Sequence, residues 1–276
     1  MFDSLPFSKK SLETKIAINA AVNSSKEILK IYNKDFSSSF KDNNEPITEA
    51  DIKSNEIIIN ELSKLEYPIL SEESSDEIKK RIDSKRIWIV DPLDGTMDFV
   101  NKTGEFTIMI ALVENNSPIL GVICHPYENK LYVAQKDQGA YSYSDKEQWT
   151  RLEVSGTSVI SQCRVVRSRF HQSEKENFFL KALGISKFTS KGSSLKVLDI
   201  SSAKAEIYFT TTNKIKQWDT CASNCIIAEA GGYMTDMSGH PLKYNTEIVA
   251  HQNGILATNN SVHQEIVQKY SEFISS

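Results

Sequence analysis

Long hydrophobic runs and Cys-x-x-Cys motifs are missing from this 276-residue sequence. No stretch approaches the roughly 18 consecutive apolar residues that span a membrane, and the first residues form no apolar signal-peptide core. None of the four cysteines belongs to a Cys-x-x-Cys pair, so we expect Cys221 and Cys225 to be core thiols rather than a redox or metal pair. We therefore expect a cytoplasmic protein without a transmembrane span, with a peripheral position at the inner face of the membrane left open.

An excess of positive charge is also missing. The 32 basic and 36 acidic residues give a formal net charge of −4, so no broad positive field exists to hold a nucleic-acid polymer. The sequence contains no P-loop, no strand-coupled Gly-x-Gly-x-x-Gly and no histidine pair at metal-binding spacing, so ATPase, dehydrogenase and zinc-hydrolase functions have no support. With 39% hydrophobic and 25% charged residues, the composition is typical of a folded globular protein. It carries no signal for the oligomeric state.

Two long helices are predicted near the start of the chain. Apolar residues at helical spacing mark residues 8–32 and 48–65 as amphipathic helices. Thr48 is a suitable N-cap for the second helix, and Asp51 three residues later completes a capping box. Because each helix has one apolar face, we expect both to cover a sheet.

The pattern of elements changes near residue 149. Between 87 and 134, short apolar strands are separated by turn residues, as in an antiparallel meander. After 151, strand and helix patterns alternate up to the C-terminal helix. We therefore predict an α+β lobe over residues 1–149 and an α/β lobe over residues 150–276.

The most informative motif is Trp88-Ile-Val-Asp-Pro-Leu-Asp-Gly-Thr96, an apolar strand that ends in two aspartates. Asp91 and Asp94 would emerge together at the strand terminus, and hard oxygen ligands on a turn suit magnesium. Gly95 would let backbone N–H groups approach an anion, and Thr96 would supply a hydroxyl at the next helix start. The alternative is a turn that only reverses the chain, since Asp, Pro and Gly are ordinary turn residues.

Three further acidic positions have weaker signals when each is taken alone. Glu72 lies in Leu70-Ser-Glu-Glu73 after a short possible strand, where glutamates on a solvated loop are common. Asp219 opens a helix in Trp218-Asp-Thr220, where an N-cap explains a carboxylate equally well. Asp51 has the same structural explanation, because an acid at a helix start needs no catalytic role.

Together, five segments resemble the inositol monophosphatase superfamily in their order and approximate separations. The similarity extends over nearly the whole chain, and it points most closely to the CysQ-type 3'(2'),5'-bisphosphate nucleotidases through Gly-Glu-Phe-Thr and Gly-Ser-Ser-Leu-Lys. The resemblance implies an α+β / α/β chain folded as the layered αβαβα sandwich of the inositol monophosphatase / fructose-1,6-bisphosphatase type. The segments are Leu70-Ser-Glu-Glu73, Asp91-Pro-Leu-Asp-Gly-Thr96, Gly104-Glu-Phe-Thr-Ile108, Gly192-Ser-Ser-Leu-Lys196 and Trp218-Asp-Thr220.

The resemblance also implies a site with two or three Mg2+ ions. The implied metal ligands are Glu72, Asp91, the backbone carbonyl of Leu93, Asp94 and Asp219. Asp51 and Thr96 would orient the attacking water. The implied substrate contacts are Glu72, Leu93, Asp94, Gly95, Thr96, His171, Gly192, Ser193, Lys196 and Asp219.

The function that this resemblance implies is a magnesium-dependent phosphomonoesterase. It would remove the 3'-phosphate of adenosine 3',5'-bisphosphate to give AMP and phosphate, act in sulfur metabolism and be inhibited by lithium. The chemistry is reasonable, because cations neutralise the charge that repels a nucleophile from a phosphate ester. One departure from the branch is Met97-Asp98, which stands where Lys-Glu is usual and removes a positive charge close to the site.

Three alternatives remain open at this point. An inositol phosphate or fructose-bisphosphate phosphatase would share the superfamily, and a catalytically dead regulator would bind phosphates without turnover. A haloacid-dehalogenase phosphatase also begins with strand-end aspartates. That mechanism needs aspartates at i and i+2, whereas Asp91 and Asp94 are three residues apart.

Overall fold

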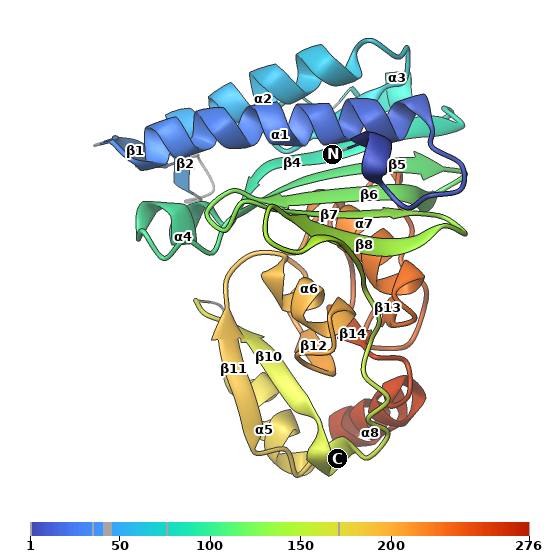
Figure 1. Ribbon diagram of the computed structural model, residues 1–276. Helices are drawn as coiled ribbons and strands as arrows, with labels where there is room; N and C mark the ends of the chain where they lie inside the picture. Colours follow the sequence, from blue (N-terminus) through green and yellow to red (C-terminus); the bar gives the residue numbers. More distant parts are fainter. Residues whose placement is uncertain (1, 35, 41–45, 76, 171, 276) are drawn as a thin grey trace.

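The computed structural model describes residues 2–34, 36–40, 46–75, 77–170 and 172–275 (Figure 1). Within these residues, the strands form a seven-stranded sheet, a five-stranded sheet and a two-stranded hairpin. The helices, in chain order, are α1 (Leu12–Tyr32), α2 (Glu49–Leu62), α3 (Ile78–Arg81), α4 (Thr96–Val100), α5 (Glu174–Ala182), α6 (Leu195–Ser201), α7 (Gln217–Glu229) and α8 (His263–Ser275). The strands are β1 (Ser38–Phe40), β2 (Pro46–Thr48), β3 (Ile69–Ser71), β4 (Arg86–Asp94), β5 (Thr107–Glu114), β6 (Ser117–His125), β7 (Lys130–Gln135), β8 (Gly139–Ser144), β9 (Gln148–Arg151), β10 (Arg164–Ser168), β11 (Lys187–Lys191), β12 (Ile207–Thr210), β13 (Tyr233–Thr235) and β14 (Ile255–Thr258).

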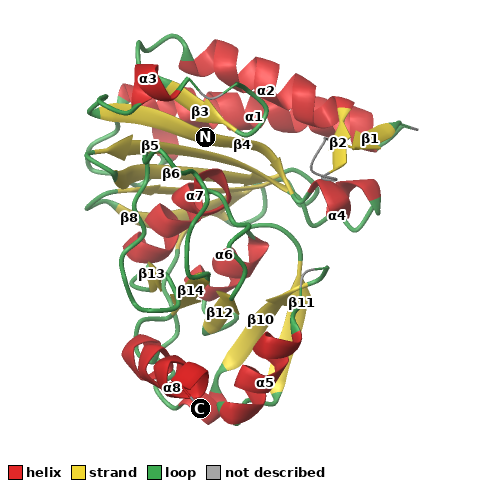
Figure 2. Cartoon of the chain, turned by 180° about the vertical axis from the view of Figure 1, so that it is seen from behind, coloured by secondary structure: helices red, strands yellow, loops and turns green. Residues whose placement is uncertain are grey.

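The large sheet runs from β3 to β9 in sequence order, and helices cover both of its faces. Helices α1 and α2 lie on the outer face, as Figure 2 shows from behind, and α7 lies on the inner face. Because side chains of a strand alternate between faces, Trp88 and Val90 pack with α1 and α2, whereas Ile87 and Ile89 pack with α6 and α7. Covering both faces explains why β4 is an almost continuous apolar run.

The small sheet has the strand order β11-β10-β12-β14-β13. Strand β10 is parallel to β11 and β12, whereas β14 is antiparallel to both of its neighbours. Helices α6 and α7 lie between the two sheets, and α5 and α8 cover the far face, where Phe179 and Tyr270 pack in one apolar cluster. The layers therefore follow the order αβαβα, which confirms the predicted sandwich. Cys221 and Cys225 on α7 are free and buried, as expected of core thiols.

The predicted helices are present with slightly different bounds. The first helix begins at Leu12 rather than Ser8, because the Ser11 side chain caps it by accepting a hydrogen bond from the Thr14 N–H at 3.1 Å. The capping box of Thr48 and Asp51 is confirmed. No helix in the described part of the chain combines the length and the apolar character needed to cross a membrane.

The two lobes predicted with a boundary near residue 149 stay a prediction. The large sheet ends at Arg151, and the small sheet begins at Arg164. However, α7 from the later part of the chain packs against β5 and β6 of the large sheet.

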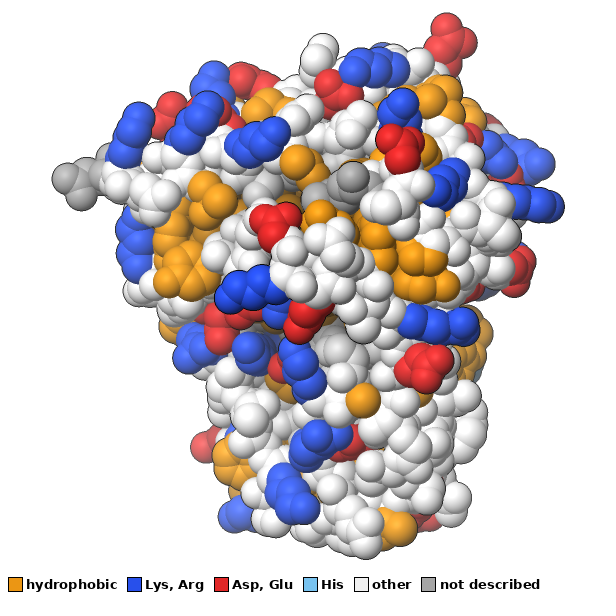
Figure 3. All heavy atoms as spheres, viewed as in Figure 1, with side chains coloured by type: hydrophobic (Ala, Val, Ile, Leu, Met, Phe, Trp, Pro, Cys, Tyr) orange, Lys and Arg blue, Asp and Glu red, His pale blue; other side chains and the backbone are white. Residues whose placement is uncertain are grey.

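On the face shown in Figure 3, Lys and Arg side chains are interspersed with Asp and Glu.

Candidate active site

A bulge at the end of β4 places the first two candidate ligands. Asp91 pairs with Met109 and Asp94 pairs with Thr107, so the register between β4 and β5 shifts within this stretch. Such a bulge re-aims side chains at a strand end. The Asp91 Oδ1 atom accepts a hydrogen bond from the Leu93 N–H at 3.0 Å, which holds the turn in shape.

Two other segments bring acidic side chains to Asp91. Strand β3 runs parallel to β4, and the Glu72 N–H just beyond it donates to the Val90 carbonyl at 3.2 Å. Asp219 lies in the first turn of α7, where its Oδ2 accepts the Lys216 N–H at 2.7 Å. Carboxylate oxygens of Glu72, Asp91 and Asp219 lie within 4.8 Å of one another. The structure thus assembles three of the predicted ligands from three distant segments.

This cluster of Glu72, Asp91 and Asp219 is electrostatically strained as long as no cation is present. Asp91 is 1% exposed. Burial raises its pKa well above the ordinary value, and the nearby charges of Glu72, Asp94 and Asp219 raise it further. Buried carboxylates that repel one another are the donor set expected for a hard divalent cation, which would relieve the repulsion. The residues therefore fit a metal site.

Asp94 lies beside this cluster and connects it to a second loop. Its Oδ2 accepts hydrogen bonds from the Ser194 N–H and, at 3.3 Å, from the Thr107 hydroxyl. Burial raises the pKa of Asp94, while the positive charge of Lys196 opposes that rise. Asp94 is close enough to Asp91 to affect its pKa, yet it also fixes the loop that carries Ser194.

Asp51 and Thr96 form the second predicted pair. The Thr96 hydroxyl donates to Asp51 Oδ1 at 3.0 Å and has the Leu93 carbonyl as another acceptor at 3.2 Å. Asp51 Oδ2 accepts from both the N–H and the hydroxyl of Thr48, at 2.7 and 2.6 Å. Burial raises the pKa of Asp51 to about 6, although the hydrogen bonds from Thr48 and Thr96 oppose the rise. Asp51 can therefore change charge near neutral pH.

The remaining predicted substrate residues lie on two adjoining turns. Gly95 is the N-cap of α4 in a left-handed conformation, with φ +91°. The loop before α6 approaches it, since a Cβ built at Gly95 would lie 3.1 Å from the Cβ of Ser193. Lys196 is half-buried, and its Nζ donates to the Ser193 carbonyl. His171 lies outside the described residues.

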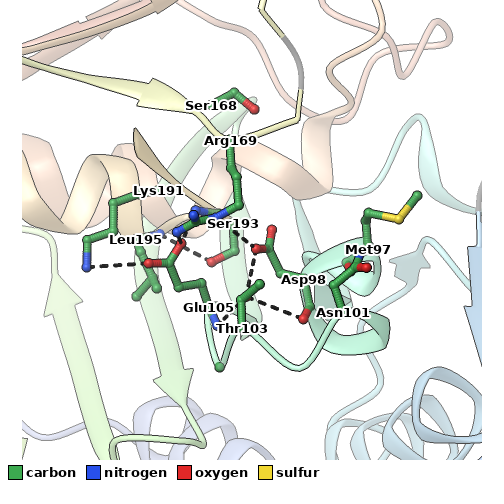
Figure 4. Close-up of polar contacts among 12 residues, drawn as sticks. Met97, Asp98, Asn101, Thr103, Glu105, Ser168, Arg169, Lys191, Ser193 and Leu195 are labelled. Carbon is green, nitrogen blue, oxygen red and sulfur yellow. Dashed lines mark hydrogen bonds and ion pairs between the residues drawn. The ribbon is translucent and has the colours of Figure 1, made fainter. Parts of the chain in front are cut away.

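Sequence reasoning assigned no role to three charged residues beside this loop. Asp98, Glu105 and Arg169 form an ion cluster at the edge of the candidate site, and Figure 4 shows Arg169 lying between the two carboxylates. Glu105 belongs to the Gly-Glu-Phe-Thr segment that carries part of the family resemblance, but the sequence alone did not indicate the role of Glu105. Met97 is exposed, and its side chain points away from this cluster.

The chain is similar to known proteins in both sequence and structure. The model of the inositol monophosphatase family matches residues 9–275. The 3'(2'),5'-bisphosphate nucleotidase CysQ of Escherichia coli K12 is 37% identical over 214 residues, which cover 74% of this chain and 81% of that protein. CysQ of Buchnera aphidicola is 36% identical over 224 residues, covering 79% and 82%. The crystal structure of CysQ from Bacteroides thetaiotaomicron has 31% identity and a TM-score of 0.77, covering 90% of this chain and 97% of that one.

Proposed function

Because the chain belongs to the inositol monophosphatase family and is a phosphatase, we propose that it hydrolyses the 3'-phosphate of adenosine 3',5'-bisphosphate to AMP and phosphate. Two observations together support this proposal: the partly buried cluster of Glu72, Asp91 and Asp219, and relatives that are named 3'(2'),5'-bisphosphate nucleotidase. The slightly negative overall charge of the chain is compatible with a small phosphorylated substrate. Metal ions bound at the site would attract the phosphate locally.

We assign the metal sites to Glu72, Asp91, the Leu93 carbonyl, Asp94 and Asp219, with Mg2+ as the ion and two or three ions in total. When bound, Mg2+ would neutralise charge on the phosphate oxygens and lower the pKa of water. The acids needed for this task come from the end of β4, the residue after β3 and the first turn of α7. The side-chain ligands of the set thus lie within or directly beside regular elements.

In this proposal, Asp51 and Thr96 orient the attacking water. Ionised Asp51 Oδ1 accepts a hydrogen bond from the Thr96 hydroxyl, so the lone pairs of Thr96 Oγ1 are free to accept a hydrogen bond from water. The two bonds from Thr48 fix the other Asp51 oxygen and hence the carboxylate plane. Water held in this way has one lone pair directed away from Thr96, as an in-line attack on phosphorus requires.

The substrate side is assigned to the two turns that meet near Gly95. N–H groups of Gly95 and Thr96 would bind the departing phosphate at the start of α4. Gly192, Ser193 and Lys196 would contact the nucleotide, with Lys196 supplying positive charge. His171 retains its predicted nucleotide contact.

The substrate assignment is tested by a phosphate-release assay with purified protein. Adenosine 3',5'-bisphosphate, inositol 1-phosphate and fructose 1,6-bisphosphate are compared at equal concentrations, with Mg2+ and after chelation with EDTA. We expect the nucleotide to be hydrolysed fastest and the rate to vanish with EDTA. A much faster reaction with inositol 1-phosphate would show that the nucleotide assignment is wrong. Release from none of these phosphomonoesters would favour a binding regulator.

The metal assignment is tested by Asp91→Asn, with exposed Asp83→Asn as the control. Without Mg2+, the Asp91 variant should be at least as thermally stable as the wild type, because a repelled buried charge is removed. Mg2+ should raise the melting temperature of the wild type and of Asp83→Asn by mass action, but not that of Asp91→Asn. Melting curves with and without Mg2+ measure both effects. A shift of wild-type size in Asp91→Asn would contradict the assignment.

A further inference from the structure

An ion cluster joins the large-sheet side of the molecule to the loop that precedes α6. It consists of Asp98 on α4, Glu105 just before β5, and Arg169 just after β10. The Arg169 Nη2 donates to Glu105 Oε2 at 2.6 Å, and its Nε lies 3.5 Å from Asp98 Oδ1 (Figure 4). Since both carboxylates face one guanidinium, the Arg169 charge is neutralised within the protein rather than directed at a substrate.

The Glu105 side chain holds the loop by accepting a hydrogen bond from the loop backbone. The Gly192 N–H donates to Glu105 Oε2 at 2.7 Å, and Lys191 Nζ lies 3.9 Å from Oε1. The Glu105 N–H donates in turn to the Thr103 hydroxyl at 3.2 Å. The side chain of Glu105 is only 17% exposed. A partly buried carboxylate that accepts from both an amide and a guanidinium resists displacement.

Asp98 shapes the same contact from the other side. It is 3% exposed, and its Oδ1 accepts the Thr103 hydroxyl at 2.7 Å. A Cβ placed on Gly192 would lie 2.2 Å from Asp98 Oδ2, so only glycine allows the loop to approach this closely. The sequence has Met97-Asp98 where Lys-Glu is usual in the branch. The aspartate, which is shorter than a glutamate, therefore lies where the backbone of the loop passes.

The short segment 192–194 is thus fixed at both ends by acids of the large-sheet side. Gly192 is held by Glu105, and the Ser194 N–H by Asp94. The Ser194 hydroxyl also lies 2.6 Å from the Thr107 hydroxyl. Between them, Ser193 has a φ of +48°, an uncommon conformation for a residue with a side chain. Such a conformation persists only where surrounding contacts enforce it.

We propose that Glu105 is a positioning residue for the substrate side of the active site. With Asp98 and Arg169, it fixes segment 192–196 against the metal-binding side, so that Ser193 and Lys196 have their positions before substrate arrives. Glu105 does not itself contact substrate. The inference rests on the proposed function, because it assigns segment 192–196 to the nucleotide.

The chain contains a matched control at the opposite end of β10. Glu206 accepts the Arg164 N–H at 2.6 Å and the Arg164 Nε–H at 3.1 Å. It therefore makes the same two kinds of contact as Glu105, one to an amide and one to an arginine. Glu206→Gln should weaken the small sheet without altering the loop near Asp94, which separates general destabilisation from positioning.

The experiment compares Glu105→Gln with Glu206→Gln by hydrogen exchange and by kinetics. In Glu105→Gln we expect amides of 192–196 to exchange roughly tenfold faster, as loss of a charge-assisted hydrogen bond implies. With adenosine 3',5'-bisphosphate and Mg2+, KM should rise roughly tenfold, while kcat stays within about threefold because the metal ligands are untouched. Glu206→Gln should change neither exchange in 192–196 nor KM.

Several outcomes would overturn the proposal. These are unchanged exchange in Glu105→Gln, faster exchange without a rise in KM, and an equal rise in KM in Glu206→Gln. If Glu105→Gln fails to fold, Arg169→Gln removes the same ion pair from a side chain that is 36% exposed, and the same expectations apply. If the wild type releases no phosphate from any substrate, the proposed function fails, whereas the exchange measurement still decides whether Glu105 fixes the segment.

Discussion

Asp51 shows how local hydrogen bonds set the charge of a single carboxyl group. Its pKa of about 6 comes first from burial, which Thr48 and Thr96 partly offset. Because Oδ2 already accepts two hydrogen bonds from Thr48, a proton on Asp51 would lie on Oδ1 and compete with the hydrogen bond from Thr96, so the ionised form is the one that suits the proposed role. The proposed chemistry therefore depends on a titration close to neutral pH.

The first residue-scale prediction concerns the pH dependence of turnover. Because the ionised form of Asp51 is the active one, kcat with saturating Mg2+ should fall at acid pH, below the metal-free pKa of about 6 because bound cations favour the carboxylate. Thr48→Val deletes a hydrogen bond that lowers the pKa of Asp51, so the fall should begin at higher pH. Plots of log kcat against pH for wild type, Thr48→Val and a Thr157→Val control measure the shift. Coincident profiles for all three proteins would argue against a role for Asp51.

At the same scale, the sequence predicts some site residues better than others. Asp91 and Asp94 could be inferred from a strand that ends in a turn, because the chemistry and the geometry are both local. Asp98, Glu105 and Arg169 could not, since their pairing depends on how α4 and β10 come together in the fold. A charged residue separated from its partner by 64 positions, as Glu105 is from Arg169, leaves no periodic signal.

At the scale of elements, α7 links the proposed metal site to the packing of the large sheet. Its first turn carries Asp219, and its following turns lie against β6. The contact is close because Gly121 has no side chain: a Cβ there would lie 2.5 Å from the Ala222 carbonyl. The position of Asp219, a proposed metal ligand, is thus set by backbone packing several residues away.

Gly121→Ala should accordingly displace α7. We expect a loss of unfolding free energy of about 1 to 3 kcal/mol from overpacking, together with weaker Mg2+ binding because Asp219 moves with its helix. Denaturant titrations and the Mg2+ dependence of the melting temperature measure the two effects. Gly156→Ala is the control, since nothing lies within 4 Å of that position. If Gly121→Ala were destabilised but bound Mg2+ with wild-type affinity, the packing of α7 would not control the metal site and the prediction would be wrong.

Elements with aliphatic periodicity could be predicted from the sequence, and those without it could not. The helix after Thr48 and the strand before Asp91 have clear apolar patterns and caps. Strands β8 and β9 were missed because β8 alternates tyrosine with serine and β9 is a largely exposed strand at the sheet edge. Their pairing with β7 and with each other, rather than their own composition, makes them strands.

At the scale of the whole molecule, two of the buried histidines, His251 and His263, connect stability to pH. His251 lies 2.7 Å from the Thr220 hydroxyl, and His263 lies 2.9 Å from the hydroxyls of both Thr235 and Thr258. Burial lowers the pKa of each histidine from 6.5 to about 4. Between these values the unfolded chain binds protons that the folded chain excludes.

The contribution of these two histidines to the free energy of unfolding should therefore decrease as pH falls from about 6.5 toward 4, whereas buried acids with raised pKa values, such as Asp51 and Asp91, act in the opposite direction. Each histidine adds a slope of up to about 1.4 kcal/mol per pH unit. Urea titrations at several pH values measure the slope, and His263→Asn should reduce it relative to the wild type. His240→Asn serves as the control, because that side chain is 76% exposed. Equal slopes in His263→Asn and the wild type would contradict this expectation.

The position of α7 between the sheets also determines where the chain cannot be divided. A cut between Arg151 and Arg164 would leave the first fragment with an uncovered apolar sheet face, because the helix that covers it belongs to the second fragment. The second fragment would in turn expose the side of α7 that normally contacts β5 and β6. Since neither fragment has a closed core, the two should behave as complementary halves that fold only on association. Joined in one chain, they should unfold in a single cooperative transition.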